Sequence, residues 1–221
     1  MANAYELGKV SIHNTTKDAF KGSTVHTEDG EFKGAYYLSE RPEYYEPQRS
    51  NCFKFVVNDL KVDLAAYGIK NTYTDDDLKT SIELSVKASS VPHFDIDKLT
   101  INRGNSQMHF AGKPTFKDGQ ITVHDYIGTH VKDILLAWQH QAYDVDTEKI
   151  GLAKDYKRTA KLYELTPDYQ IVREWTLYGC WISGLSEGNY DHDSTEARTV
   201  DATIIYDYAK PVIWPGASDE K

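Results

Sequence analysis

Apolar and polar residues alternate along much of the chain, which is the pattern of β-strands with one buried face. The clearest case is residues 81–89, where Ile82, Leu84 and Val86 share one face and polar residues occupy the other. This pattern predicts a half-buried strand there. Comparable patterns predict strands within residues 52–68, 97–112, 118–126, 157–165, 169–183 and 199–209.

The predicted strand at residues 169–183 is long and apolar on both faces. Alternation places Trp175, Leu177 and Trp181 on one face. The other face would carry Val172, Tyr178, Cys180 and Ile182. Such a strand is typical of the centre of a sheet, or of a sheet whose second face is buried by a partner.

One segment, residues 129–144, shows the helical period instead. Its apolar residues recur every three or four positions and predict one amphipathic helix with a buried Trp138. We expect Thr129 to cap the start of this helix. Roughly eight strands or more and one flanking helix predict a mainly β fold, an antiparallel β-sandwich or partly closed barrel.

The first fifty residues are polar and less regular. Asp29-Gly30 is a turn signal between two β-like flanks and predicts a hairpin. Residues 39–51, rich in tyrosine and proline, predict a surface loop or an arm that lies on a neighbouring subunit. We expect one domain over residues 1–221, in which residues 1–80 carry a polar N-terminal arm or hairpin insertion, and a polar tail at residues 211–221.

Composition and charge narrow the classes of partner. The 221 residues carry a net charge of −9, which argues against a phosphate-binding surface. No apolar run is long enough to span a bilayer and no secretory signal is visible, so we expect folding in the cytosol. Cys52 and Cys180 fit no metal or redox spacing and are expected to be free thiols, at least one of them buried.

Candidate chemistry is sparse. Asp191-His192-Asp193 is either a metal or acid–base site or the solvated tip between two strands, and its Gly, Ser and Asn neighbours favour the tip. His124, Asp125 and His130 do not have a recognised ligand spacing. The three successive residues Asp75, Asp76 and Asp77 predict a solvated loop. We therefore predict no catalytic residue, no cofactor and no metal site, and a protein that is not an enzyme.

From about Val91 onward, the order of signals resembles the tail tube proteins of contractile-tailed bacteriophages. The shared features are strands around an Arg-Gly-Asn turn, the segment "ITVHDYIG", and a helix ending in "LLAWQ". They continue with a tryptophan-containing strand that leads into a turn at Trp181 to Gly184, a polar loop, and a last strand ending in Tyr206-Asp207-Tyr208. The resemblance covers residues 80–208, and the first 80 residues are longer and more polar than the family leads us to expect.

The resemblance implies a structural subunit. Six copies would form a ring by pairing edge strands, and rings would stack into a hollow tube inside a contractile sheath. DNA would pass through the lumen without specific binding, and the partners would be further copies of the chain, the sheath, the baseplate and the tail terminator. The protein would lie in the virion after assembly in the host cytoplasm.

Within this class, a baseplate tube initiator or a secretion-system or bacteriocin tube remain alternatives. Residues expected to form interfaces are Tyr44, Tyr45, Asp75, Asp76, Asp77, Asp191, His192 and Asp193. Two other classes stay open. One is a receptor- or glycan-binding virion protein that uses the tyrosines of residues 36–45. The other is a small β-barrel metal enzyme built around Asp191–Asp193.

Overall fold

The computed structural model of the protein describes residues 47–65, 69, 73–188 and 190–213, together with the backbone of four short N-terminal strands. It divides the chain into two units, Met1–Arg49 and Ser50–Lys221. The strands of the first unit form an antiparallel sheet in the order β1-β2-β3-β4. They are Glu6–Leu7, Val10–Ile12, Val25–Thr27 and Gly30–Phe32. Thr27 pairs with Gly30, which confirms the predicted N-terminal hairpin.

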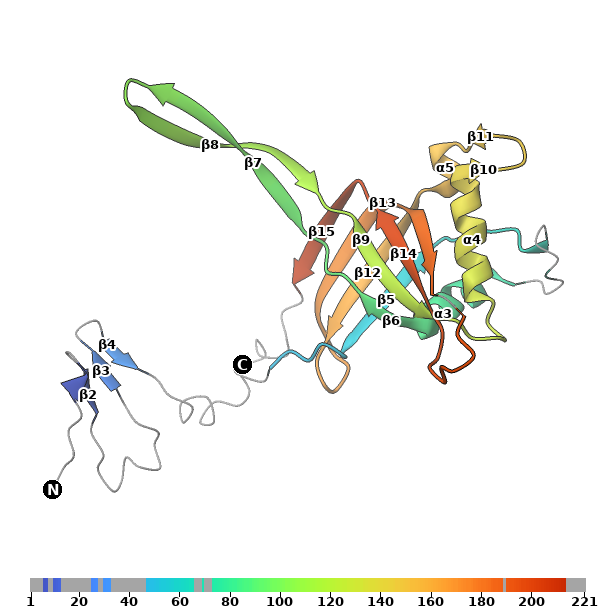
Figure 1. Cartoon of the computed structure of the whole chain (residues 1–221), viewed down its shortest axis with the longest axis horizontal. Coiled ribbons are helices and arrows are strands. Elements are labelled where there is room, and N and C mark those ends of the chain that lie inside the picture. The colour runs from blue at the N-terminus through green and yellow to red at the C-terminus, as the bar shows by residue number, and fades with distance from the viewer. Residues whose placement is uncertain are drawn as a thin grey trace, which may run out of the picture. The chain divides into compact units, whose positions relative to one another are not determined.

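The second unit is built around one long strand, β13 (Ile171–Glu187) (Figure 1). Its first half pairs with β12 on one edge and β15 on the other, and its second half pairs with β14. The sheet continues outward from β12 to β5, and from β14 through β9 to β6, always antiparallel. These strands are β5 (Phe53–Asn58), β6 (Val86–Ser89), β9 (Gly119–His124), β12 (Arg158–Leu165), β14 (Thr199–Ile205) and β15 (Tyr208–Ile213). The predicted antiparallel, mainly β fold is confirmed.

Three helices accompany this sheet in the described part of the chain: α3 (Asp75–Ser85), α4 (Val131–Ala142) and the single turn α5 (Ala153–Tyr156). The apolar stripe of α4 is buried as predicted, and Trp138 is fully buried with its indole N–H donating to the Tyr156 carbonyl oxygen at 2.7 Å. Among the described residues, no helix has the length and apolarity that a bilayer crossing needs.

The prediction of a single helix was wrong, because residues 81–85 belong to α3 and not to a strand. Thr74 and Asp77 form a capping box that starts the helix, and Leu78, Ile82 and Ser85 then fall on one buried face at helical spacing. Leu84, assigned by alternation to the buried face, is 72% exposed. The alternating pattern becomes a strand only at β6.

The predicted faces of β13 were also wrong. Leu177, Cys180 and Ile182 all lie in the core, although strict alternation would put Leu177 opposite the other two. Gly179, with φ of +68°, lies within a break in the β12–β13 register and supplies the extra residue that shifts the alternation. Trp181 consequently leaves the core face.

Smaller differences concern caps and ends. Thr129 does not cap α4; the helix begins after His130, whose backbone is left-handed with φ of 51°. Pro211 to Ile213, expected in a polar tail, belong to β15. The predicted turn at Arg103-Gly104-Asn105 is confirmed. The turn expected at Trp181 to Gly184 is not there, because these residues lie inside β13. Cys52 and Cys180 are both free and buried, as predicted.

Candidate assembly interface

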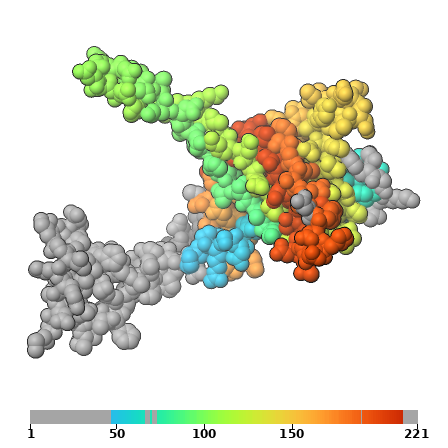
Figure 2. Space-filling view, in the orientation of Figure 1, coloured from blue at the N-terminus to red at the C-terminus, as the bar shows by residue number. Residues whose placement is uncertain are grey.

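A long two-stranded hairpin projects from the sheet of the second unit (Figures 1 and 2). It consists of β7 (Phe94–Arg103) and β8 (Ser106–Phe116), which pair only with each other. Two strands alone cannot enclose a core, so most of their side chains remain exposed. The hairpin therefore presents side chains that a partner could cover.

Apolar residues gather on one face of the outer half of this hairpin. The register pairs Leu99 with Phe110 and Ile101 with Met108, so these four side chains share a face. Their exposed fractions are 54%, 46%, 48% and 51%. The opposite face carries polar residues, namely Lys98, Thr100, Asn102, Gln107 and His109. We name the four apolar residues the hairpin face.

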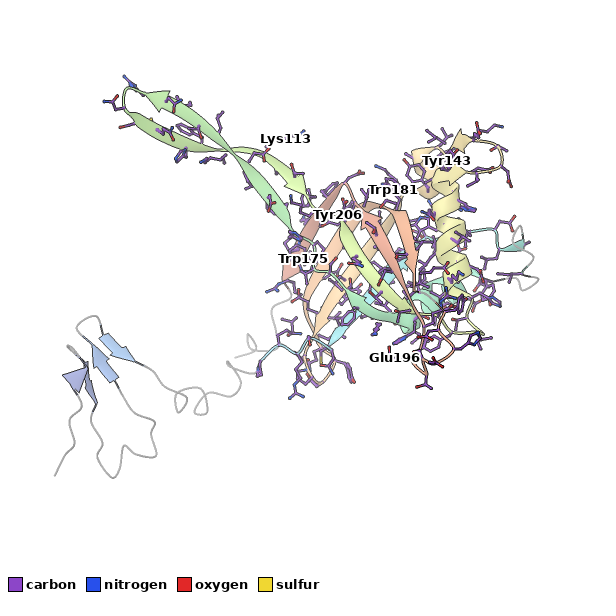
Figure 3. The ribbon with its side chains drawn as sticks, viewed as in Figure 1. Lys113, Tyr143, Trp175, Trp181, Glu196 and Tyr206 are labelled. Carbon is purple, nitrogen blue, oxygen red and sulfur yellow. The ribbon has the colours of Figure 1, made fainter. Side chains whose placement is uncertain are left out.

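The base of the hairpin, unlike its outer half, is held to the core by an aromatic contact. The Phe116 ring lies between Phe94, at a centroid distance of 5.2 Å, and the core residue Tyr206, at 6.0 Å. Figure 3 labels Tyr206 at the base of the hairpin. An irregularity between Ile96 and Lys98 then shifts the register, and the apolar residues beyond it lie on the other face of the ribbon. Of the hairpin's apolar residues, Phe116 packs against the core, whereas the four residues of the hairpin face belong neither to the core cluster nor to the residues packed on it.

A second exposed apolar surface lies at the C-terminal end of α4. The short strands β10 (Tyr143–Asp144) and β11 (Lys149–Ile150) form a turn there. Four exposed apolar residues surround it, with exposed fractions of 47% to 80%: Tyr143, Val145, Ile150 and Leu152. A cavity of about 290 Å³ continues from Tyr143 and Val145 to Trp181 on β13. We name these four residues the turn patch.

The turn patch is bordered by acidic residues. Asp144, Asp146 and Glu148 are all exposed and alternate with its apolar residues. The Asp144 carboxylate accepts hydrogen bonds from the Asp146 and Thr147 N–H groups at 2.9 and 3.3 Å. Hydrogen bonding to Thr147 lowers the pKa of Asp144, which keeps this carboxylate charged.

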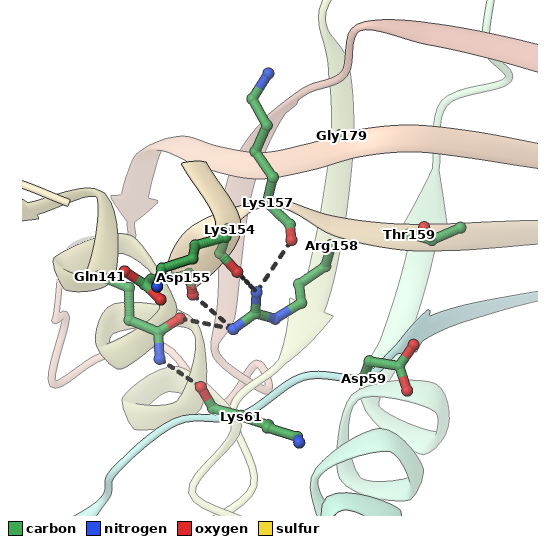
Figure 4. Close-up of a pocket in the computed structure, with 9 residues that line it drawn as sticks. All are labelled: Asp59, Lys61, Gln141, Lys154, Asp155, Lys157, Arg158, Thr159 and Gly179. Atoms are coloured by element: carbon green, nitrogen blue, oxygen red, sulfur yellow. Dashed lines mark hydrogen bonds between the residues drawn. The ribbon is translucent and has the colours of Figure 1, made fainter. Parts of the chain in front are cut away.

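A cavity of about 620 Å³, lined by charged and polar residues, lies open to solvent beside α5 (Figure 4). Its main cation, Arg158, donates to the carbonyl oxygens of Asp155, Lys157 and Lys154 at 2.6, 3.0 and 3.2 Å. Its guanidinium also reaches the Gln141 side-chain oxygen at 3.4 Å, and burial lowers the pKa of Arg158. Both terminal nitrogens of the Arg158 guanidinium thus bind backbone carbonyls of residues 154–157, so this side chain acts as a structural clamp on α5.

Six of the eight residues predicted for interfaces lie in the described part of the chain. Tyr44 and Tyr45 lie outside the described residues, as does the tyrosine-rich segment 36–45. Asp75, Asp76 and Asp77 are exposed, but they form the first turn of α3 and not a loop, because Asp77 accepts hydrogen bonds from Thr74. Hydrogen bonding to Thr74 also lowers the pKa of Asp77.

Asp191, His192 and Asp193 lie in an exposed turn between β13 and β14. The Asp191 carboxylate accepts a hydrogen bond from the Asp193 N–H at 3.0 Å, and its carbonyl accepts one from Ser194 at 3.3 Å. This is a self-contained aspartate turn. Among the described residues, no group of three or more His, Cys, Asp or Glu side chains is arranged to hold a metal ion.

Sequence analysis missed the hairpin face and the turn patch. Alternation in residues 97–112 predicted strands but did not reveal that the pair leaves the sheet. The sequence carries no signal for this, because only the strand pairing shows that β7 and β8 have no third strand.

Known proteins resemble this chain in sequence and in fold. No protein-family model matches the chain. The tail tube protein gp19 of Enterobacteria phage T4 is 27% identical over 125 residues, covering 55% of this chain and 77% of gp19. The gp19 protein of Enterobacteria phage T6 matches to the same extent.

Solved structures share the fold. A chain of the sheath–tube complex of an extracellular contractile injection system gives a TM-score of 0.55 at 13% identity, covering 80% of this chain and 97% of that one. A chain of the tube-terminating cap of the anti-feeding prophage also gives 0.55, at 11% identity, covering 76% of this chain and 92% of that one. Sequence and fold therefore point to one group of proteins.

Proposed function

We propose that the protein is a structural subunit of a contractile tail tube, as the resemblance to the tail tube proteins leads us to expect. The observation that carries the proposal is the sequence match to gp19, a tail tube protein. The solved neighbours support the fold alone, and they come from injection systems as well as a prophage. The phage match in sequence favours a phage tail tube over an injection-system tube.

We further propose that six copies form a ring and that rings stack into a tube within a virion tail. Cyclic symmetry closes an assembly sideways, and a head-to-tail contact along the axis permits growth. Within the described residues, β5, β6 and β15 each pair along one edge only, and a neighbouring copy can pair the other edge. Sheath, baseplate and terminator proteins are the further partners that this role implies.

Passage of DNA is consistent with the charge of the chain. A net charge of −9 repels phosphate over roughly the Debye length, about 8–10 Å at physiological salt. A lumen lined by such subunits would conduct DNA without holding it. No described feature favours the glycan-binding or metal-enzyme alternatives.

Negative-stain electron microscopy of the full chain, across protein and salt concentration, tests the proposal. Hollow rings or tubes with six-fold end views are expected. A protein that stays monomeric at high concentration, both alone and with the sheath protein of the same particle, would contradict it.

A further inference from the structure

We propose that the hairpin face of one copy docks on the turn patch of a second copy, and that this contact joins subunits in the assembly. The inference rests on the proposed function and adds the two surfaces that meet. The hairpin face is Leu99, Ile101, Met108 and Phe110, and the turn patch is Tyr143, Val145, Ile150 and Leu152.

The first argument is apolar exposure. Each of these eight side chains is about half exposed or more in the isolated chain. Contiguous apolar groups on a soluble protein mark surfaces that a partner covers. The cross-strand pairs of the hairpin place a row of four such groups on one face of its outer half.

The second argument is position. The hairpin leaves one side of the second unit, and β10 and β11 lie at its other side, beyond the end of α4 (Figure 1). One chain therefore cannot bring the two surfaces together. Two different surfaces on one molecule that fit each other form a heterologous contact, which generates rings or stacked assemblies.

The third argument is charge. From residue 98 to 111 the hairpin carries Lys98 and Arg103 and no carboxylate. From residue 143 to 150 the turn carries Asp144, Asp146 and Glu148 against Lys149 alone. Strand alternation places Arg103 at the tip, on the same side as Leu99 and Ile101. Opposite charges at the rim of an apolar contact set its orientation and suppress wrong pairings.

The test is disulfide cross-linking between single-cysteine additions. Ile101→Cys and Val145→Cys variants are purified separately, mixed, allowed to assemble and oxidised. Background is low because Cys52 and Cys180 are buried, and burial raises the pKa of Cys180 to about 12. The matched control is Thr100→Cys, which lies next to Ile101 on the polar face of the hairpin.

The expected result is a cross-linked dimer of the Ile101→Cys and Val145→Cys chains, and little product when Thr100→Cys replaces Ile101→Cys. Arg103→Glu should raise the concentration needed for assembly by about tenfold, and adding Asp146→Lys should recover much of the loss. Equal product with Thr100→Cys, or hairpin-to-hairpin product from Ile101→Cys alone, overturns the pairing.

Wild-type microscopy separates the two proposals. Tubes that form normally while the Ile101→Cys and Val145→Cys chains fail to cross-link overturn the docking and leave the tube function standing. In that case the hairpin face contacts another part of the tube or a different protein. Failure of the wild-type chain to assemble overturns the proposed function, and the docking falls with it.

Discussion

Gly179 lies so close to Asp207 that any side chain at position 179 would overlap the Asp207 carboxylate. A Cβ built on Gly179 would come within 2.7 Å of Asp207 Cγ, and closer still to one carboxylate oxygen. The same carboxylate accepts hydrogen bonds from Lys157 Nζ at 2.7 and 2.8 Å, and the Asp207 N–H donates to the Tyr178 carbonyl at 2.9 Å. One contact therefore holds both the bulge in β13 and the passage from β14 to β15.

We expect Gly179→Ala to lower the free energy of unfolding by about 2–4 kcal/mol, because it combines a left-handed backbone with a clash that displaces Asp207. Urea unfolding followed by circular dichroism measures the change. Gly184→Ala is the matched control on the same strand, since a Cβ there meets no heavy atom within 4 Å. A similar loss in both variants would contradict the account.

Arg158 should behave as a clamp on α5. Arg158→Ala removes charged hydrogen bonds to three backbone carbonyls, and we expect it to lower the free energy of unfolding by about 1.5–3 kcal/mol. Hydrogen exchange should show faster exchange in residues 153–158. Lys154→Ala, which removes an exposed side chain from the same helix, should change little, and equal exchange in the two variants would argue against the clamp.

Much of the fold was predictable because strand alternation and helical spacing report burial directly. Residues 199–206 show this: Val200, Ala202, Ile204 and Tyr206 alternate in sequence and are all buried. The stripe of α4 is equally plain. In these elements the local pattern and the tertiary burial agree.

The failures occurred where a local signal competed with the pattern. Residues 81–85 alternate as a strand would, but the capping box of Thr74 and Asp77 starts a helix that runs through them. Leu78, four residues after Thr74, is the first buried residue of that helix. At Gly179 one extra residue reversed the faces of β13. A bulge cannot be read from alternation, because both registers give an apolar face here.

The sequence predicted that the protein associates with copies of itself, but it did not predict the hairpin face or the turn patch as the candidate interface. Resemblance to tube proteins predicted that surfaces for self-association exist, but not where they lie. The hairpin face emerges only when pairing shows that β7 and β8 have no third strand, and the roles predicted for the acidic and tyrosine-rich segments remain predictions.

The start of α3 gives a direct test of the capping box. Thr74→Ala removes the hydroxyl that accepts from the Asp77 N–H at 3.2 Å, and we expect it to lower the free energy of unfolding by about 1 kcal/mol. Chemical denaturation measures the change. Thr80→Ala, at an exposed position inside the same helix, should leave stability unchanged or raise it slightly. A loss at residue 80 as large as that at residue 74 would rule out a specific capping effect.

Glu187, the last residue of β13, should make the stability of the protein depend on pH in the acid range. Its carboxylate binds Lys132 Nζ at 2.9 Å and also pairs with Arg198. The hydrogen bond from Lys132 lowers the pKa of Glu187 in the folded protein below its unfolded value. The stabilisation is therefore complete above the unfolded pKa, about 4.3, and is lost as pH falls through the folded pKa.

Glu187→Gln should accordingly lower the free energy of unfolding by about 0.5–1 kcal/mol at neutral pH and low salt, because exposed ion pairs contribute little and are screened. The difference from wild type should shrink as pH falls below about 4, where the wild-type carboxylate becomes protonated. Glu196→Gln is the control, since Glu196 is exposed in the loop between β13 and β14 and forms no ion pair with a described residue (Figure 3). Denaturation curves at several pH values measure both variants, and a Glu187→Gln effect that stays constant with pH would mean that the charge is not its cause.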